Sequence, residues 1–89
     1  MQLDETAIID VLKRLRRAEG QIRGVIGMLE DGRDCADVVT QLAAVSRAVD
    51  RAGFRLIASG LQQCVTERGG GTVPSADEER LERLFLSLA

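Results

Sequence analysis

The chain of 89 residues contains no histidine, tryptophan or tyrosine, and it has only two phenylalanines and one proline. So few aromatic side chains argue against an aromatic-rich β fold and favour close-packed helices built from Ala, Val, Leu and Ile. The sequence also lacks basic and aromatic side chains in alternation, the pattern on which single-stranded nucleic acids stack. No apolar run approaches the roughly 18 residues of a membrane span. The absence of histidine also removes the commonest general acid–base from any cysteine chemistry.

The length and the cysteine content restrict the class further. A chain of this size supports one domain with a modest core, so association with other chains would bury more apolar surface. The first 20 residues lack a signal-peptide core, which predicts a cytoplasmic protein with reduced thiols. Cys35 and Cys64 therefore indicate metal or redox chemistry more than a structural disulfide. The alternative is that both act as small buried hydrophobes.

Helical spacing runs through most of the chain. One apolar stripe at three- and four-residue intervals contains Ile8, Leu12, Leu15, Ile22, Val25, Ile26 and Leu29. Gly32 suits the left-handed end of this first helix, and Asp34 suits the N-cap of the next. Ser75 and Glu78 fit a capping box at the start of a third helix. We expect one all-α domain over residues 1–89, with helices at about 4–30, 34–67 and 75–88 and a glycine-rich linker at 68–74.

Cys35 and Cys64 lie 29 residues apart in the second predicted helix. At ~100° per residue this is about eight turns plus ~20°, so both thiols lie on nearly the same side, within the apolar face. They are about 43 Å apart along the axis, whereas a disulfide needs Cα atoms within about 7 Å. The conflict disappears if two copies of the helix pack antiparallel about a twofold axis near Val49 and Asp50. Cys35 of one chain then faces Cys64 of the other.

The two thiols are not equivalent in sequence. Cys35 lies in the first turn of its helix, where the helix dipole favours the thiolate, although the acidic neighbours Asp34 and Asp37 oppose this effect. We therefore expect Cys35 to be the nucleophile and Cys64 the resolving thiol. Gly53 and Gly60 share the cysteine face and predict close approach of a partner helix there.

Basic residues gather on two helices of a chain whose formal charge is -2. The candidate contacts to nucleic acid are Lys13, Arg14, Arg16, Arg17, Gln21 and Arg23 on the first helix and Arg47, Arg51 and Arg55 on the second. A single stripe of arginines is most often a solvated helix face. Two stripes on helices that pack side by side would form a broad positive surface able to meet the phosphates of a DNA duplex.

The chain resembles a known family at a specific set of residues. These are Arg14-Leu15-x-x-x-Glu19-Gly20-Gln21-Ile22-Arg23-Gly24-Val25, then Met28, Cys35 and Gln41-Leu42-Ala43-Ala44-Val45. They are similar to the bacterial copper-sensitive operon repressor family over residues 8–66. The resemblance implies an all-helical protomer, an antiparallel dimer and a dimer-of-dimers tetramer. It also implies a repressor that releases operator DNA when an inducer binds at an intersubunit cysteine site.

The chain departs from the family pattern at informative positions. In the pattern of the copper-sensing members, a histidine lies four residues before the second cysteine. This chain has Gly60 at that position. The nickel and cobalt branch needs several histidines, and the formaldehyde branch needs a proline where Gln2 stands. Two cysteines without histidine are most similar to the persulfide-sensing branch, in which sulfur atoms bridge the paired thiols.

Three hypotheses follow. The first is a DNA-binding repressor whose Cys35–Cys64 pair is modified by persulfides or other reactive sulfur species, with no resident cofactor. The second is the same repressor with Cu(I) held by the two thiolates, which suit a soft metal. The third is a thiol-dependent oxidoreductase, which is disfavoured because no acid–base pair stands beside either cysteine. We therefore expect a homo-oligomer that binds duplex DNA, is not an enzyme and has no membrane partner.

Overall fold

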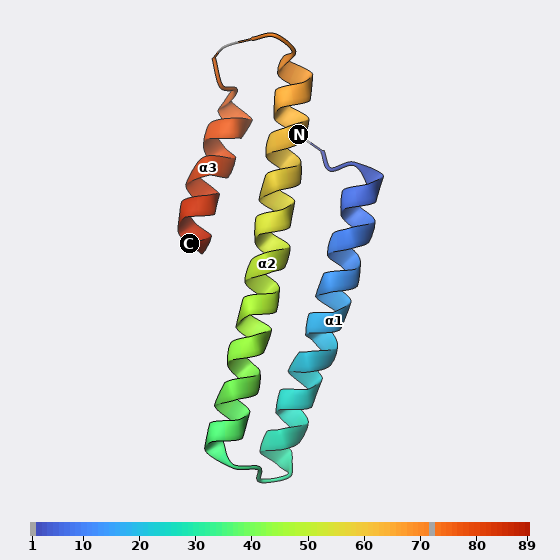
Figure 1. The fold of residues 1–89 in the computed structure, drawn as a ribbon, viewed down its shortest axis with the longest axis vertical. Coiled ribbons are helices and arrows are strands. Elements are labelled where there is room, and N and C mark those ends of the chain that lie inside the picture. The colour runs from blue at the N-terminus through green and yellow to red at the C-terminus, as the bar shows by residue number, and fades with distance from the viewer. Residues whose placement is uncertain (1, 72) are drawn as a thin grey trace.

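Three α-helices make up the fold, and the described residues of the computed structural model, 2–71 and 73–89, contain no strand. α1 spans Glu5–Glu30, α2 spans Cys35–Arg68 and α3 spans Ala76–Leu88. α2 lies in the middle, with α1 along one side and the shorter α3 along the other (Figure 1). The Cα atoms extend over 57 × 25 × 12 Å, so the molecule is long and flat. The all-α prediction is confirmed.

Local caps set where the first two helices begin and end. Asp4 Oδ1 accepts a hydrogen bond from the Ala7 N–H at 2.6 Å, and Asp34 Oδ2 accepts one from the Ala36 N–H at 3.1 Å. Both carboxylates therefore satisfy backbone donors that a helix start leaves free. Beyond α1, Gly32 has φ of 70°, the left-handed conformation predicted from the sequence. This tight connection turns α2 antiparallel to α1 (Figure 1).

α1 and α2 pack through a narrow seam of small and β-branched side chains. The buried residues recur every seven positions, Val11, Ala18 and Val25 on α1 and Val38, Val45 and Ala52 on α2. A seven-residue repeat keeps one seam in contact along two antiparallel helices. The seam leaves the core of one chain thin, because no large side chain among the described residues is fully buried.

The larger apolar side chains lie outside this seam. At least 41% of each of the following residues is exposed: Ile8, Leu12, Leu15, Ile22, Ile26 and Leu29 on α1, and Val39, Leu42 and Val49 on α2. Of the stripe predicted for the first helix, only Val25 is buried against α2. A single chain has no further layer of structure to cover the others. No helix in the described part of the chain is long and apolar enough to span a membrane.

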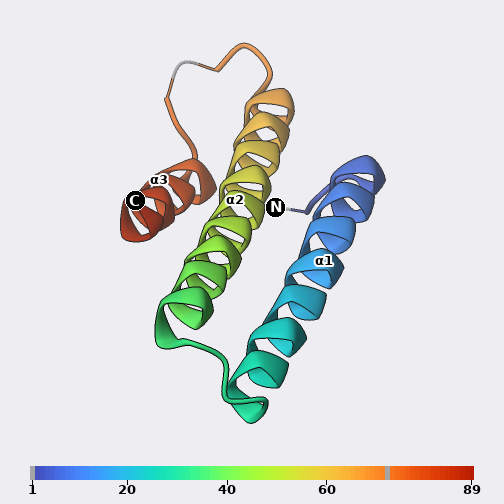
Figure 2. The ribbon, with the colours of Figure 1, turned by 60° about the horizontal axis from the view of Figure 1, so that its bottom comes forward.

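α3 folds back along the C-terminal half of α2, on the side away from α1 (Figures 1 and 2). Ser75 Oγ accepts a hydrogen bond from the Glu78 N–H at 3.2 Å, which forms one half of the predicted capping box. The carboxylate of Glu78 reaches Arg68 on α2 at 2.9 Å instead. Leu81 is the one apolar residue of the described α3 that is buried, so the helix is anchored by few contacts.

Candidate nucleic-acid interface and thiol pair

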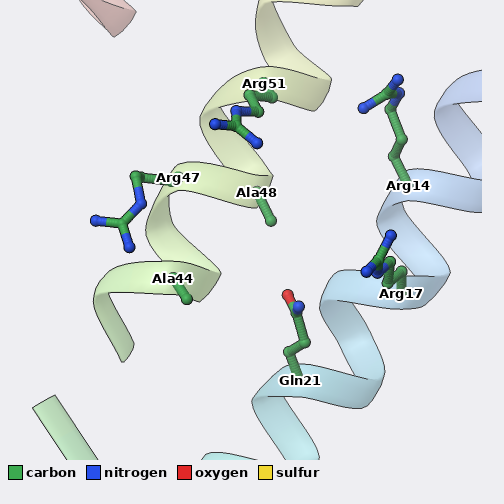
Figure 3. A pocket seen from close by; sticks show the side chains of 7 residues that line it. All are labelled: Arg14, Arg17, Gln21, Ala44, Arg47, Ala48 and Arg51. Carbon is green, nitrogen blue, oxygen red and sulfur yellow. The ribbon is translucent and has the colours of Figure 1, made fainter. Parts of the chain in front are cut away.

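A basic groove lies between α1 and α2 near the middle of the hairpin. Its volume is about 270 Å³, and it is lined by Arg14, Arg17 and Gln21 from α1 and by Ala44, Arg47, Ala48 and Arg51 from α2 (Figure 3). Spacings of three and four residues place each set on one face of its helix. The two alanines leave the space between the arginines open. Four arginines from two separate segments of the sequence thus line one groove.

Asp10 limits the charge at one end of this surface. Its Oδ2 lies 3.3 Å from Arg14 Nε and 3.3 Å from Arg55 Nη1. Arg55 is therefore tied to α1 and does not line the groove. The spacing of Asp10 and Arg14, four residues on one helix, could have indicated the first contact from sequence. The contact to Arg55 depends on how the helices pack, and no local pattern predicts it.

Three of the remaining predicted contacts lie outside the groove. Lys13, Arg16 and Arg23 are exposed and are not among its lining residues. Gln21 projects into the groove, and its buried Oε1 has no hydrogen-bond partner among the described residues. Either end of an amide can face the groove, so Gln21 can donate from its NH₂ group to an incoming oxyanion. Guanidinium and amide donors around one concavity form a surface suited to phosphate oxygens.

The two thiols lie in different environments. Cys35 begins α2 and is exposed, whereas only 3% of Cys64 is exposed. Cys64 packs in a cluster with Ile57 and with Leu81 of α3, and the half-buried Leu61 borders it. Cys64 thus lies among apolar side chains, and unlike Cys35 it is covered. The reason is that α3 covers this end of α2, which spacing within one helix cannot reveal.

The thiols of one chain cannot meet. Both belong to one continuous helix, so 29 residues at about 1.5 Å each place them about 43 Å apart along its axis. A disulfide between Cys35 and Cys64 therefore cannot form within one protomer. The described residues also contain no group of three or more Cys, Asp or Glu side chains arranged to hold a metal ion.

α3 also occupies the positions where small residues predicted contact with a partner helix. A Cβ added at Gly53 would lie 2.8 Å from Leu88 Cδ1, so the close neighbour of Gly53 is the chain's own α3. Gly60 is buried and lines an apolar cavity of about 470 Å³ between α2 and α3, together with Leu56, Leu81 and Leu84.

Comparison with known proteins defines the class first. The copper-sensing transcriptional repressor RicR of Mycobacterium tuberculosis is 41% identical over 70 residues, which cover 79% of this chain and 73% of RicR. The structure of the nickel-responsive transcriptional regulator InrS superposes with a TM-score of 0.78 at 26% identity, covering 100% of this chain and 98% of that one. The copper-sensing repressor CsoR of Geobacillus thermodenitrificans, solved with Cu(I), superposes with a TM-score of 0.73 at 30% identity, covering 99% and 88%. The fold and these relatives define a helical transcriptional repressor.

The model of the family described as "Metal-sensitive transcriptional repressor" matches residues 8–86. The chain belongs to this family, which confirms the family resemblance predicted from the sequence. It is a transcriptional repressor and not an enzyme, in line with the relatives that match it.

Proposed function

We propose that the protein is a cytoplasmic repressor that binds operator DNA through the basic groove and releases it when Cys35 is bridged to Cys64 of the partner subunit. The observation that carries this proposal is that the chain's only two thiols lie at opposite ends of one helix, out of reach of each other. The same helix exposes apolar side chains between them, at Val39, Leu42 and Val49. A pair of thiols with this spacing becomes a site only when two chains associate.

An antiparallel dimer would bury the exposed apolar face of α2 and would also bring Cys35 close to Cys64 of the partner subunit. With a twofold axis near Val49 and Asp50, the open apolar face of one α2 covers the same face of the other, as an isologous interface requires. Cys35 of each chain then lies at the level of Cys64 of the partner subunit. The exposed isoleucines and leucines of α1 provide further surface for assembly, and the family resemblance favours a tetramer made of two such dimers.

DNA binding follows from the groove. Arg14, Arg17, Arg47 and Arg51 place four positive charges around one concavity on a chain of net charge -2. Such a surface attracts phosphates regardless of base sequence and loses affinity as salt rises. Lys13, Arg16 and Arg23 are exposed outside the groove and are candidate further contacts.

Reactive sulfur species are the inducers that the residues of this chain favour. The Cys35 thiolate attacks the outer sulfur of a persulfide RSSH, the S–S bond breaks, RS⁻ leaves and takes up a proton, and Cys35 becomes a persulfide. The thiolate of Cys64 of the partner subunit attacks the Cys35 sulfur and expels HS⁻, which leaves a disulfide. The persulfide is reduced by two electrons as the two thiols are oxidised. A second persulfide, reacting before closure, adds a sulfur atom and gives a trisulfide.

Cu(I) is the second candidate, and the relatives favour it. RicR and CsoR are named as copper-sensing, and the latter was solved with Cu(I). The donors here would be two thiolates from different chains, which suit soft Cu(I). The chain offers no histidine, and Gly60, at the position of the family's histidine, has no side chain to add as a third ligand. Because two thiolates without a histidine are the only donors of the family's site in this chain, we rank persulfide above Cu(I) as the inducer.

Operator release, measured by fluorescence anisotropy at several salt concentrations, tests the proposal. The reduced wild-type protein and the Cys35→Ser variant should bind equally well, and persulfide should release only the wild type. Arg14→Ala and Arg51→Ala should each lower the salt slope of log K by about 0.9 for each phosphate that is no longer neutralised, whereas Arg83→Ala on α3 serves as the unaffected control. A Cys35→Ser protein that still releases DNA on persulfide addition would overturn the sensing site.

The same anisotropy assay is repeated with Cu(I) in place of persulfide, with the concentration of free Cu(I) held very low by a buffering ligand. Release by persulfide and not by buffered Cu(I) supports sulfur sensing. Release by Cu(I) alone, abolished by Cys35→Ser, would reject persulfide as the inducer and establish the copper alternative at the same two thiols.

A further inference from the structure

α3 covers Cys64 but not Cys35, and besides Leu81 three contacts near the two ends of the helix help to hold it. At its start, Arg68 Nε donates a 2.9 Å hydrogen bond to Glu78 Oε1. Near its end, the rings of Phe54 and Phe85 pack with centroids 5.3 Å apart. Leu88, the last residue of the helix, lies against Gly53.

The ion pair between Arg68 and Glu78 is better shielded from water than the other ion pairs given for the described residues. The exposed fractions of these two side chains are 23% and 10%. Arg68 also donates from Nη1 to the carbonyl oxygen of Gly71 in the linker. One guanidinium thus joins the last turn of α2, the linker and the first turn of α3.

Most of α3 beyond these anchors faces solvent. Residues 82–89 are all exposed, even the anchors Phe85 and Leu88 at 44% and 40%, and only Glu78 and Leu81 of this helix are buried. An element with so few buried contacts opens at a small fraction of the free energy of global unfolding.

We infer that α3 is a lid over the Cys64 thiol and that Glu78, acting through Arg68, is the residue that positions this lid. The inference rests on the proposed thiol function for its biological role, because it orders the two chemical steps. Cys35 is open to an inducer at all times, whereas Cys64 reacts only while α3 is displaced. Glu78 touches neither the inducer nor a reacting sulfur, so it is a positioning residue.

The rate of Cys64 alkylation by N-ethylmaleimide tests the lid without using persulfide or DNA. In the Cys35→Ser background only Cys64 can react, and the reference should react far more slowly in buffer than in denaturant. When opening and closing are fast, this rate follows the open population. Glu78→Gln should raise the rate roughly tenfold, equivalent to about 1.4 kcal/mol of lost closure free energy. Glu79→Gln, at the exposed neighbouring position, should leave it unchanged.

A mutant cycle separates positioning from general loosening of the fold. Arg68→Gln should raise the rate as much as Glu78→Gln, and the double variant should be no faster than either, because the two side chains act as one pair. Arg68→Lys, which keeps the charge, should stay closer to the reference. Leu88→Ala removes the packing against Gly53 and should also raise the rate while the ion pair remains.

Two results would overturn the lid. One is a Cys64 that reacts in the folded reference as fast as in denaturant, and the other is an alkylation rate that neither Glu78→Gln nor Arg68→Gln changes. A failure of persulfide to bridge the subunits would leave these alkylation rates as expected, so the two proposals fail independently.

Discussion

The carboxylate of Asp10 lies 3.3 Å from the guanidinium of Arg55, although 45 residues separate them in the sequence. The same oxygen lies 3.3 Å from Nε of Arg14, which lines the basic groove. The side chain of Asp10 is 42% exposed, so each ion pair contributes at most about 1 kcal/mol to stability. The larger consequence of the proposed DNA contact is electrostatic, because this carboxylate would compete with phosphate for two arginines.

Asp10→Asn should therefore strengthen binding to non-operator duplex and steepen its salt dependence, by up to about 0.9 in the slope of log K for each additional phosphate that is neutralised. Operator affinity should rise less, so the ratio of specific to non-specific binding should fall. Anisotropy titrations on both duplexes measure this ratio. Glu79→Gln, which removes an exposed acid on α3, is the matched control, and weaker non-specific binding by Asp10→Asn would contradict the competition.

The apolar face of α2 predicts how assembly can be disrupted. Val49 is 43% exposed in one chain and lies near the proposed twofold axis. Val49→Asp would place two carboxylates opposite each other in a desolvated interface, at a cost of several kcal/mol, roughly 3–5. Sedimentation velocity should show dissociation of this variant, whereas Val73→Asp in the exposed linker should assemble normally. An unchanged oligomer for Val49→Asp would mean that the axis lies elsewhere.

A substitution at Gly60 should change how tightly the protein binds Cu(I). Gly60→His restores a nitrogen ligand at the position of the family's histidine, and the adjacent apolar cavity of about 470 Å³ gives the ring room. The variant should bind Cu(I) more tightly than the wild type, with a nitrogen neighbour visible by X-ray absorption spectroscopy. Ser59→His, one position along the helix, should add no such ligand. Equal Cu(I) affinities for Gly60→His and the wild type would place the Cu(I) ligands away from this position.

Much of the fold could be predicted because its signals are local. Caps such as Asp34, the left-handed Gly32 and the helical spacing of apolar residues are read from a few neighbouring residues, and they gave helix bounds within one residue of those observed. The sequence also predicted that arginines of the first two helices would lie near each other, because these helices had to pack side by side. The groove lined by Arg14, Arg17, Arg47 and Arg51 agrees with this.

The packing between helices could not be predicted in the same way. The sequence pattern showed that Cys64 lies on an apolar face but not that α3 covers this face. Similarly, the contacts of Arg55 with Asp10 and of Arg68 with Glu78 depend on the relative placement of helices. The large residues of α1 formed the more obvious stripe, yet smaller residues such as Ala18 form the seam with α2.

Mixing two single-cysteine variants tests the central claim, a bridge between subunits, most directly. Cys35→Ser labelled with ¹⁵N is unfolded and refolded together with unlabelled Cys64→Ser, treated with persulfide and examined by intact-mass spectrometry without reductant. The account predicts a covalent dimer of one labelled and one unlabelled chain, joined through Cys35 of one and Cys64 of the other, with additional sulfur atoms where the bridge is longer than a disulfide. Covalent dimers made only of like chains, or unmodified monomers alone, would contradict it.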